Sequence, residues 1–355
     1  MRQVFAVSER AAVIAKRLVL LFAILDITFA RPICYYPLVS NQDRSPPDAS
    51  AKGPEVMQRA LVVGGSGFVG RAILTQLGPE RGIGTWHKAP TAGLIRFDAA
   101  TGRLSELLGV LPNDITHVFV PFGISNPEAC AIDPEGTRRI NVDGAIRLMQ
   151  DAFSAGIVPI YVSTDYVYDG AKALRTEDEP QVPNTEYGRH KAAVERWLAT
   201  RPEPWLVARL SKVVSGDTAR RSVLGEWIND LRNGRVMRSA TDQIFSPAFV
   251  DDIAGAMVKL AETGLQGIFH LAGPEPMSRY QLNRLLVDSI EAIDPRVKTS
   301  LDACSLRDIP FREQRPLNTS LSIGKLQAAI AWRFVSMSDL CRTIARAEFS
   351  QDAAT

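Results

Sequence analysis

The sequence predicts an α/β fold of the Rossmann type, a doubly wound parallel sheet with a smaller C-terminal substrate-binding lobe. Two observations predict it. Short apolar runs alternate with stretches of helical period from Arg59 to about Ser211, and such alternation is typical of right-handed parallel βαβ units. A glycine-rich turn follows the first apolar run, at the position where folds of this class hold the phosphates of a dinucleotide.

Composition and charge limit the class of protein. The chain has 355 residues and 46% hydrophobic content, enough for one large core or two modest ones. Its 41 basic and 39 acidic residues are spread evenly, so no nucleic-acid-binding surface is indicated. The four cysteines lie far apart without a C-x-x-C pair, and the four histidines are not at metal-ligand spacing. We expect neither a disulfide framework nor a bound metal.

The first 56 residues differ from the rest. Basic residues up to Arg17 precede the apolar run "LVLLFAILDITFA" and a linker rich in Pro and Ser. The run is too short to span a bilayer and contains Asp26, so stable membrane insertion is not expected. Three interpretations stay open: a dispensable leader or mispredicted start before Met57, a targeting peptide, and an accessory arm. We expect the chain to act in the cytoplasm.

Six apolar runs are predicted to be buried strands. They are "ALVVGG", "GIGTWH", "GLIRF", "THVFVPFG", "VPIYVST" and "WLVARLS". Residues 135–153 have helical period, and later the segments 222–234 and 278–293 resemble surface helices of a smaller lobe. The predicted organisation is a dinucleotide-binding domain over 57–210, a substrate-binding lobe over 211–345 that is partly interleaved with the sheet, and a tail over 346–355.

The glycine turn is the first candidate binding element. Gly64, Gly67 and Gly70 form G-x-x-G-x-x-G, with Phe68 and Val69 between the last two. Glycines here permit a tight turn and close approach of the backbone to a pyrophosphate, which the N-terminus of the next helix attracts. We expect these five residues to bind the cofactor.

The end of the second predicted strand bears on which cofactor binds. The segment "GTWHKAP" has no acidic residue to hold both ribose hydroxyls of NAD, and offers His87 and Lys88 instead. We therefore expect NADPH, with NADH as the alternative. Asp98 follows the third strand, where its carboxylate could accept from the adenine amino group or cap a helix.

Three residues form the predicted catalytic group. Thr164 ends a central strand, and Tyr187 and Lys191 are four residues apart, which places both on one helical face. Reduction of a carbonyl by hydride needs a proton donor, and a phenol with a free pKa of ~10 needs cationic neighbours to serve near neutrality. Lys191 would lower that pKa and hold the nicotinamide ribose, and Thr164 would polarise the carbonyl.

From Arg59 to about Ile344 the chain resembles the extended short-chain dehydrogenase/reductases, most of all the dTDP-4-dehydrorhamnose reductase group. The resemblance is carried by "GGSGFVG", "RINVDGAIRLMQDA", "YVSTDYVYDG", "YGRHK", "DQIFSPAFVDDIAGAM", "GIFHLAGPEPMSRYQL" and "RPLNTSLSIGKL". It implies an NAD(P)H-dependent enzyme with Thr164, Tyr187 and Lys191 as catalytic trio. It further implies a sugar-nucleotide pocket near Asp165, near Arg315 with Pro316, and near the loop of Asp242, Gln243 and Pro247.

Some positions depart from the family pattern. Nucleotide-sugar dehydratases show Asp-Glu after the catalytic Thr, whereas this chain has Asp165 and then Tyr166, so dehydration is disfavoured. Lys212 stands where the reductase group tends to have an aromatic residue, and "VPFGISNPEAC" replaces an Asn-Ala-Ala-like turn. Two interpretations of Asn141 stay open: an ordinary helix position, which is favoured, and a support of the site through hydrogen bonds. His190 is predicted to point away from the face of Tyr187 and Lys191, at the surface.

The sequence therefore predicts a reductase of a nucleotide-linked 4-keto sugar, in nucleotide-sugar metabolism, that takes hydride from NADPH and a proton from Tyr187. Two alternatives stay open. One is a nucleotide-sugar epimerase that retains NAD, and the other is a non-catalytic regulatory subunit, because the methionine adenosyltransferase beta subunit resembles the same reductase group. The sugar, the base and the oligomeric state are left open, with a homodimer as one candidate.

Overall fold

The computed structural model describes residues 57–217, 222–297 and 299–350. The expectations for residues 1–56 and for the end of the tail lie outside the described residues. The domain boundaries stay predictions.

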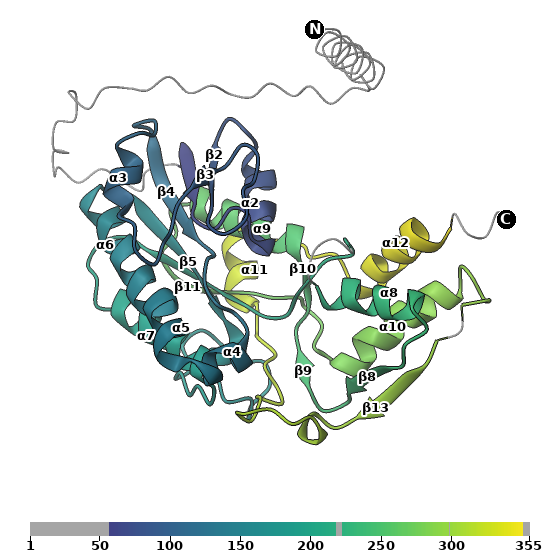
Figure 1. Ribbon diagram of the computed structural model, residues 1–355. Coiled ribbons are helices and arrows are strands. Elements are labelled where there is room, and N and C mark those ends of the chain that lie inside the picture. Colours follow the sequence, from purple (N-terminus) through teal and green to yellow (C-terminus); the bar gives the residue numbers. More distant parts are fainter. Residues whose placement is uncertain (1–56, 218–221, 298, 351–355) are drawn as a thin grey trace, which may run out of the picture. The chain divides into compact units, whose positions relative to one another are not determined.

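Seven parallel strands form the central sheet (Figure 1). Its order is β11-β6-β5-β4-β1-β2-β3, so the chain winds outward in both directions from the middle, as the doubly wound prediction requires. The strands are β1 (Arg59–Val62), β2 (Gly82–Trp86), β3 (Ile95–Arg96), β4 (Ile115–Val120), β5 (Val158–Thr164), β6 (Leu206–Leu210) and β11 (Gly267–Leu271).

All six predicted strands are present, and the sheet has a seventh that the apolar pattern did not predict. The central strands β4, β5 and β6 are buried almost throughout, because helices cover both faces of a parallel sheet. The seventh strand, β11, begins at the half-buried Gly267 and pairs in parallel with β6. It is therefore the edge strand on that side of the sheet.

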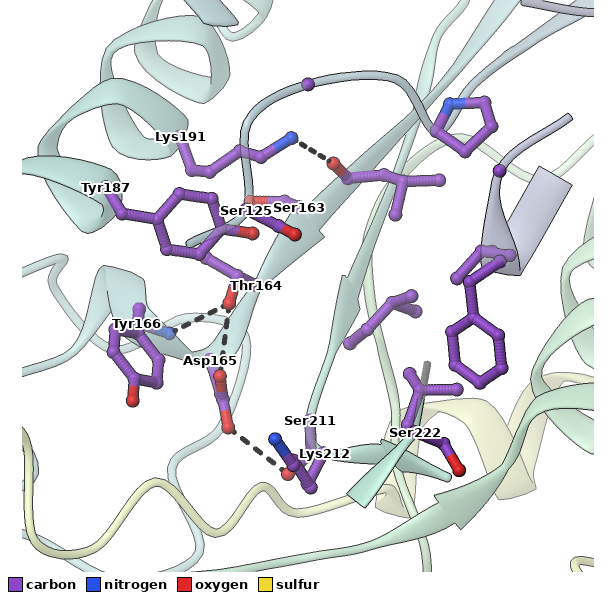
Figure 2. Close-up of a pocket in the computed structure, with 18 of the residues that line it drawn as sticks. Ser125, Ser163, Thr164, Asp165, Tyr166, Tyr187, Lys191, Ser211, Lys212 and Ser222 are labelled. Carbon is purple, nitrogen blue, oxygen red and sulfur yellow. Dashed lines mark hydrogen bonds between the residues drawn. The ribbon is translucent and has the colours of Figure 1, made fainter. Parts of the chain in front are cut away.

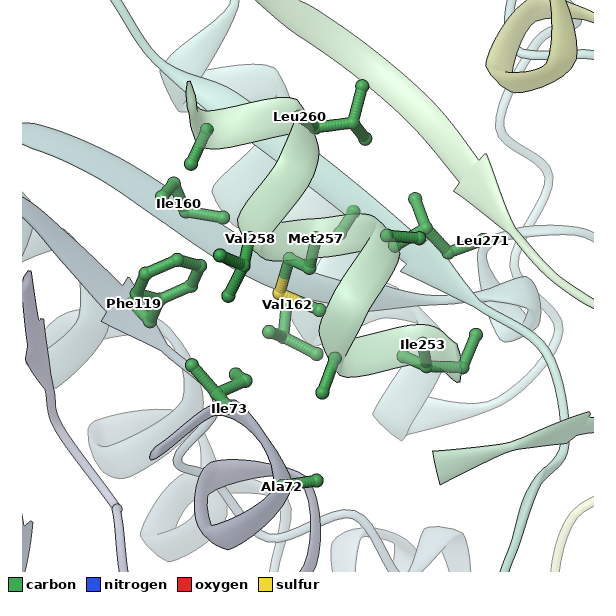
Figure 3. Packing of buried hydrophobic residues seen from close by; sticks show 14 of the residues in the cluster. Ala72, Ile73, Phe119, Ile160, Val162, Ile253, Met257, Val258, Leu260 and Leu271 are labelled. Carbon is green, nitrogen blue, oxygen red and sulfur yellow. The ribbon is translucent and has the colours of Figure 1, made fainter. Parts of the chain in front are cut away.

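Helices cover both faces of the sheet. One face packs against α2 (Phe68–Leu77), α9 (Val250–Glu262) and α11 (Gly324–Ile330). Figure 3 shows side chains of α9 meeting Ile73 of α2 and the strand residues Phe119 and Ile160. The other face packs against α3 (Leu104–Leu108), α6 (Ala145–Ser154) and α7 (Glu186–Leu198). The apolar stripe of each helix is thereby removed from water, which is the main stabilising contribution to such a layer.

The predicted helix over 135–153 is present but is not uniform. It consists of α5 (Pro134–Arg138), a π-helical turn η2 (Arg139–Gly144) and α6, and it follows α4 (Pro127–Ile132). A π-helical turn inserts an extra residue into a helix and is often found at functional sites. Here it contains Asn141, whose side chain is buried.

The second half of the chain forms a lobe with its own core. The predicted helices over 222–234 and 278–293 are α8 (Val223–Arg232) and α10 (Arg279–Glu291), and α12 (Met337–Phe349) packs with them. Short strands complete it: β7 (Val213–Val214) with β10 (Ala248–Phe249), β8 (Met237–Ala240) with β13 (Leu301–Cys304), and β9 (Ile244–Phe245) with β12 (Met277–Ser278).

Candidate active site

A cavity of about 600 Å³ lies where the carboxyl ends of the strands meet the lobe. Parallel α/β sheets bind ligands at this edge. Its wall combines the glycine turn, the residues after β4, the ends of β5 and β6, and residues of the lobe (Figure 2). The polar and charged side chains among the lining residues are Ser66, Ser125, Ser163, Thr164, Asp165, Tyr166, Tyr187, Lys191, Ser211, Lys212, Ser222, Glu226, Gln243, Arg279 and Thr319.

The glycine turn has the geometry that the sequence predicted. Gly64 has a φ of +93°, and a Cβ on Gly70 would lie 2.2 Å from the Gly64 carbonyl oxygen, so side chains are excluded at both positions. Gly67 is the N-cap of α2, which has no side-chain cap and no acidic residue in its first turn. The N–H groups at this helix end are therefore available to an anion, and the residues present fit the diphosphate of a dinucleotide.

The residues predicted to choose between NADPH and NADH lie at the end of β2. His87 and Lys88 are exposed, and His87 Nε2 is 3.5 Å from Asp98 Oδ2. Asp98 Oδ1 accepts from the Ala100 amide at 2.9 Å, so its carboxylate caps a turn in this structure. Their roles toward a cofactor stay predictions.

Thr164, Tyr187 and Lys191 meet in the cavity (Figure 2). Thr164 is the last residue of β5, and Tyr187 and Lys191 share a face of α7. The Thr185 hydroxyl caps α7 by accepting from the Gly188 amide at 3.2 Å, which fixes where the helix begins. Lys191 Nζ donates to the Val162 carbonyl at 2.8 Å and lies 4.6 Å from the centre of the Tyr161 ring.

Burial dominates the electrostatics of this group. It raises the pKa of Tyr187, and a hydrogen bond with Thr164 lowers it by a smaller amount. The Lys191 ammonium donates to the Val162 carbonyl in this structure, and the expectation that it lowers the phenol pKa stays a prediction. Burial also lowers the pKa of Lys191 to about 8, against the opposing effect of Glu195. Desolvation disfavours the charged form of either group.

Asp165 forms a second polar cluster beside the catalytic group. Only 5% of this residue is exposed. Thr164 Oγ1 donates to Oδ1 at 3.1 Å and Ser211 Oγ donates to Oδ2 at 3.2 Å. Burial raises the pKa of Asp165 to about 6, while hydrogen bonds from Thr319, Thr164 and Ser211 and the Lys212 ammonium act in the opposite direction.

A buried ion pair lies one helical turn beyond Lys191. Glu195 on α7 pairs with Arg209 on β6 at 2.7 Å, and both side chains are almost fully buried. Arg209 Nη1 also donates to the Tyr168 hydroxyl at 2.6 Å, and Ser163 donates to the Glu195 carboxylate. Because Ser163 directly precedes Thr164, this buried network fixes the position of the end of β5 and so of Thr164.

Two predictions about neighbouring residues are wrong. Asn141 does more than occupy a helix position, since its Oδ1 accepts from the Ile124 amide at 2.7 Å and its Nδ2 donates to the Ile124 carbonyl at 3.0 Å. It thus holds the segment that lines the cavity after β4. His190 is not at the surface: only 2% of it is exposed, and its Nε2 lies 3.1 Å from Glu186. Asn141 covers the helix face on which His190 lies, with 3.5 Å between their side chains.

Of Gln243, Arg315 and Asp242, which were predicted to lie near the sugar-nucleotide pocket, only Gln243 lines the main cavity. Gln243 lines the cavity, and its carbonyl accepts from the Arg279 amide at 2.9 Å. Arg315 lines a neighbouring cavity of about 350 Å³, where its Nη2 donates to Glu128 Oε2 at 3.4 Å. Asp242 instead caps a short helix, η4 (Leu306–Asp308), by accepting from the Leu306 amide at 2.7 Å.

Sequence reasoning did not single out Arg279 and noted Lys212 only as a departure. Both line the cavity, and in the part of the chain that the structure describes neither side chain has a hydrogen bond or an ion pair. The Arg279 guanidinium lies 5.1 Å from the centre of the Trp227 ring. Burial and the neighbouring Arg279 lower the pKa of Lys212. No local pattern brings these two cations together, because Lys212 follows β6 whereas Arg279 begins α10, far along the sequence.

Fold and site together define an extended short-chain dehydrogenase/reductase. The family described as the RmlD substrate binding domain matches residues 58–344, and the chain belongs to this family. The methionine adenosyltransferase 2 subunit beta of Xenopus tropicalis is 26% identical over 285 residues, covering 76% of this chain and 82% of that protein. A dTDP-4-dehydrorhamnose reductase of Aggregatibacter actinomycetemcomitans is 26% identical over 306 residues, covering 77% and 93%.

Solved structures agree with this fold. A dTDP-4-dehydrorhamnose reductase from Bacillus anthracis, in complex with NADP, superposes with a TM-score of 0.70 at 18% identity and covers 81% of this chain and 98% of its own. Across the described residues, no helix has the length and apolar character needed to cross a membrane.

Proposed function

We propose that the chain is an NADPH-dependent reductase of a 4-keto sugar linked to a nucleoside diphosphate. The observation that carries the proposal is the single cavity in which the glycine turn, Thr164, Tyr187 and Lys191 converge. Relatives named as dTDP-4-dehydrorhamnose reductases, matched over more than three quarters of this chain, support the substrate class.

Each residue has a distinct role in the proposed reaction. The cofactor, when bound, supplies the hydride. The glycine turn and the N-terminus of α2 hold its diphosphate, and Lys191 holds the nicotinamide ribose. Thr164 donates to the carbonyl oxygen of the sugar, and Tyr187 gives its proton to the oxygen that becomes the new hydroxyl.

The protonation states suit reduction. Burial raises the pKa of Tyr187, so the phenol keeps its proton at neutral pH until negative charge develops on the substrate oxygen. The lowered pKa of Lys191, about 8, leaves most of this ammonium charged at neutral pH. A charged ammonium at that position favours the phenolate that forms when Tyr187 has given up its proton.

We assign recognition of the substrate to the lobe side of the cavity. Asp165 and Gln243 in the cavity wall, and Arg315 in the neighbouring cavity, are the candidates that the sequence predicted. The structure adds Lys212 and Arg279. Among the described residues, neither of these two half-buried cations has a side-chain hydrogen bond or an ion pair. They favour an anionic ligand, because burying unpaired charge costs free energy that an anion recovers. The diphosphate of a sugar nucleotide provides that charge.

A direct assay tests the proposal. Purified full-length protein is mixed with NADPH and with dTDP-4-dehydrorhamnose, then with other keto-sugar nucleotides, and loss of reduced nicotinamide is followed by absorbance. Oxidation of NADPH in proportion to the sugar reduced supports the reductase. Turnover without net redox, by protein that retains NAD through gel filtration, indicates an epimerase instead.

A second candidate function is that of a regulatory subunit, favoured by the match to methionine adenosyltransferase 2 subunit beta. A catalytic methionine adenosyltransferase is mixed with this chain and examined by gel filtration and by its rate of product formation. Co-elution with an altered rate, together with no reduction of any keto-sugar nucleotide, would replace the reductase by this function.

A further inference from the structure

A loop of the lobe, residues 306–317, reaches the start of the helix that carries Tyr187. Both ends of this loop are bonded to one short stretch of the lobe. At one end Asp242 accepts from the Leu306 amide at 2.7 Å, and at the other the Ile244 amide donates to the Leu317 carbonyl at 2.7 Å. The lobe therefore determines where the tip of the loop lies.

The tip of the loop caps helix α7. The Glu186 amide donates to both carboxylate oxygens of Glu313, to Oε2 at 2.9 Å and to Oε1 at 3.0 Å, and Arg189 Nη2 donates to Oε1 at 2.6 Å. Glu186 is the first residue of α7, so its N–H has no partner within the helix. The Glu313 carboxylate supplies that partner, and the positive end of the helix dipole favours its charge.

The two halves of α7 are held in different ways. The second half contains Glu195, which its buried ion pair with Arg209 fixes to β6. The first turn contains Tyr187, and it is held by the Thr185 cap and by Glu313. Loss of the Glu313 carboxylate should therefore loosen the first turn and leave the second half of the helix in place.

The first turn of α7 lies directly on the backbone of the short helix η3 (Asp165–Val167). A Cβ on Gly188 would lie 2.1 Å from the Tyr166 carbonyl oxygen. The rings of Tyr166 and Tyr187 meet edge-on, with their centroids 6.0 Å apart. Because this contact is so close, a small movement of the turn displaces the phenol, and a misplacement of about 1 Å can slow a catalysed step by roughly a hundredfold.

We propose that Glu313 is a positioning residue, which holds the first turn of α7 from the lobe and so sets the place of the Tyr187 hydroxyl in the main cavity. The inference rests on the proposed reductase function. Glu313 lines the neighbouring cavity and not the main one, so it acts through Tyr187 and not on the substrate. The lobe then contributes to proton transfer as well as to recognition of the sugar nucleotide.

The kinetics of Glu313→Ala test the proposal. With NADPH and dTDP-4-dehydrorhamnose, kcat should fall roughly tenfold, while the dissociation constant for NADPH stays within about twofold of the parent value. The solvent deuterium isotope effect on kcat should increase, since transfer of the proton becomes slower. Glu313→Gln keeps an acceptor for the Glu186 amide, so its kcat should recover to within about threefold of the parent.

Asp339→Ala is the matched control. It removes an acidic residue from the first turn of α12, where Asp339 pairs with Arg342, and α12 contributes no residue to the wall of either cavity. This variant should keep the parent kcat and the parent isotope effect.

A double-mutant cycle separates positioning from general damage to the site. Adding Glu313→Ala to Tyr187→Phe should not slow the residual turnover further, because the hydroxyl that Glu313 positions is already absent. Hydrogen exchange gives a measurement that needs no substrate. In Glu313→Ala the Glu186 amide should exchange about tenfold faster or more, while the second half of α7 exchanges as in the parent.

Four results would overturn the proposal: an unchanged kcat in Glu313→Ala, no recovery in Glu313→Gln, a further slowing in the double variant, or an unchanged exchange rate at the Glu186 amide. A parent protein that oxidises no NADPH with any keto-sugar nucleotide would instead overturn the reductase function. The exchange measurement would then still decide whether Glu313 holds the first turn of α7.

Discussion

At the scale of single residues, the Tyr187 hydroxyl is the atom on which the proposed chemistry depends. Tyr187→Phe keeps the ring and its edge-on contact with Tyr166 but removes the proton donor. Turnover should fall by roughly 10²–10⁴-fold while the affinity for NADPH stays the same. Steady-state kinetics and fluorescence titration of NADPH measure the two quantities. Tyr280→Phe, on α10 and outside the cavity wall, is the matched control, and an equal loss in both variants would contradict the assignment.

Lys191 makes a prediction about stability and pH. Its pKa is about 8 in the folded protein and 10.5 ordinarily. Between these values the unfolded chain binds more protons, so the parent gains stability as the pH rises, by about 3 kcal/mol in total. Lys191→Met should lack this gain and should also lose activity and cofactor affinity. Urea unfolding of both proteins from pH 7 to 10.5 measures their free energies of unfolding. If these free energies change with pH by the same amount in the two proteins, the prediction is contradicted.

Lys88 is the residue that we expect to distinguish the two cofactors. It is exposed after β2, and a charge-assisted contact with a 2′-phosphate would favour NADPH. Lys88→Ala should shift the ratio of kcat/KM values for NADPH and NADH by roughly ten- to a hundredfold. Lys259→Ala, an exposed lysine on α9, serves as control. An unchanged ratio in Lys88→Ala would show that another residue reads the phosphate.

At the scale of elements, α7 joins the chemistry to the core, because Tyr187, Lys191 and the buried Glu195 follow one another along it. Arg209→Met would leave the Glu195 carboxylate without its cation and should cost about 3–5 kcal/mol. Adding Glu195→Leu should recover part of that loss. Chemical unfolding in a double-mutant cycle measures both effects. Arg284→Met, in an exposed pair on α10, should cost less than about 1 kcal/mol, and similar losses in the two single variants would contradict this account.

Local pattern explains which elements the sequence predicts. The buried strands β4, β5 and β6 are continuous apolar runs, and the four-residue spacing of Tyr187 and Lys191 fixes their common face. The strand β11 was missed because its run is short and contains His270, whose amide is bonded to Glu177 from a distant segment. A helical wheel places His190 away from the catalytic face but cannot show that a neighbouring helix covers it.

At the scale of the whole molecule, the fold after Met57 contains a complete sheet and both helical layers. Met57 itself is buried in the core that α2 and α9 share with the sheet. A chain that begins at Met57 should therefore be soluble and should match the full chain in thermal midpoint and in NADPH binding. Calorimetry and titration of both proteins test this, and loss of cofactor binding on truncation would show that the preceding residues support the site.

The path of the chain between sheet and lobe has a mechanical consequence. After β6 the chain enters the lobe, returns for α9 and β11, leaves again for α10 and β13, returns for α11, and ends with α12. A protease that cuts one connecting loop therefore does not release either part. The chain leaves the sheet through β7, after β6, and returns to it through β10, before α9, and these two strands are paired with each other. Strand β7 begins directly after Lys212 in the cavity wall. A rotation of the lobe against the sheet would bend this paired ribbon, and it would therefore displace the cavity wall beside Asp165 and Ser211.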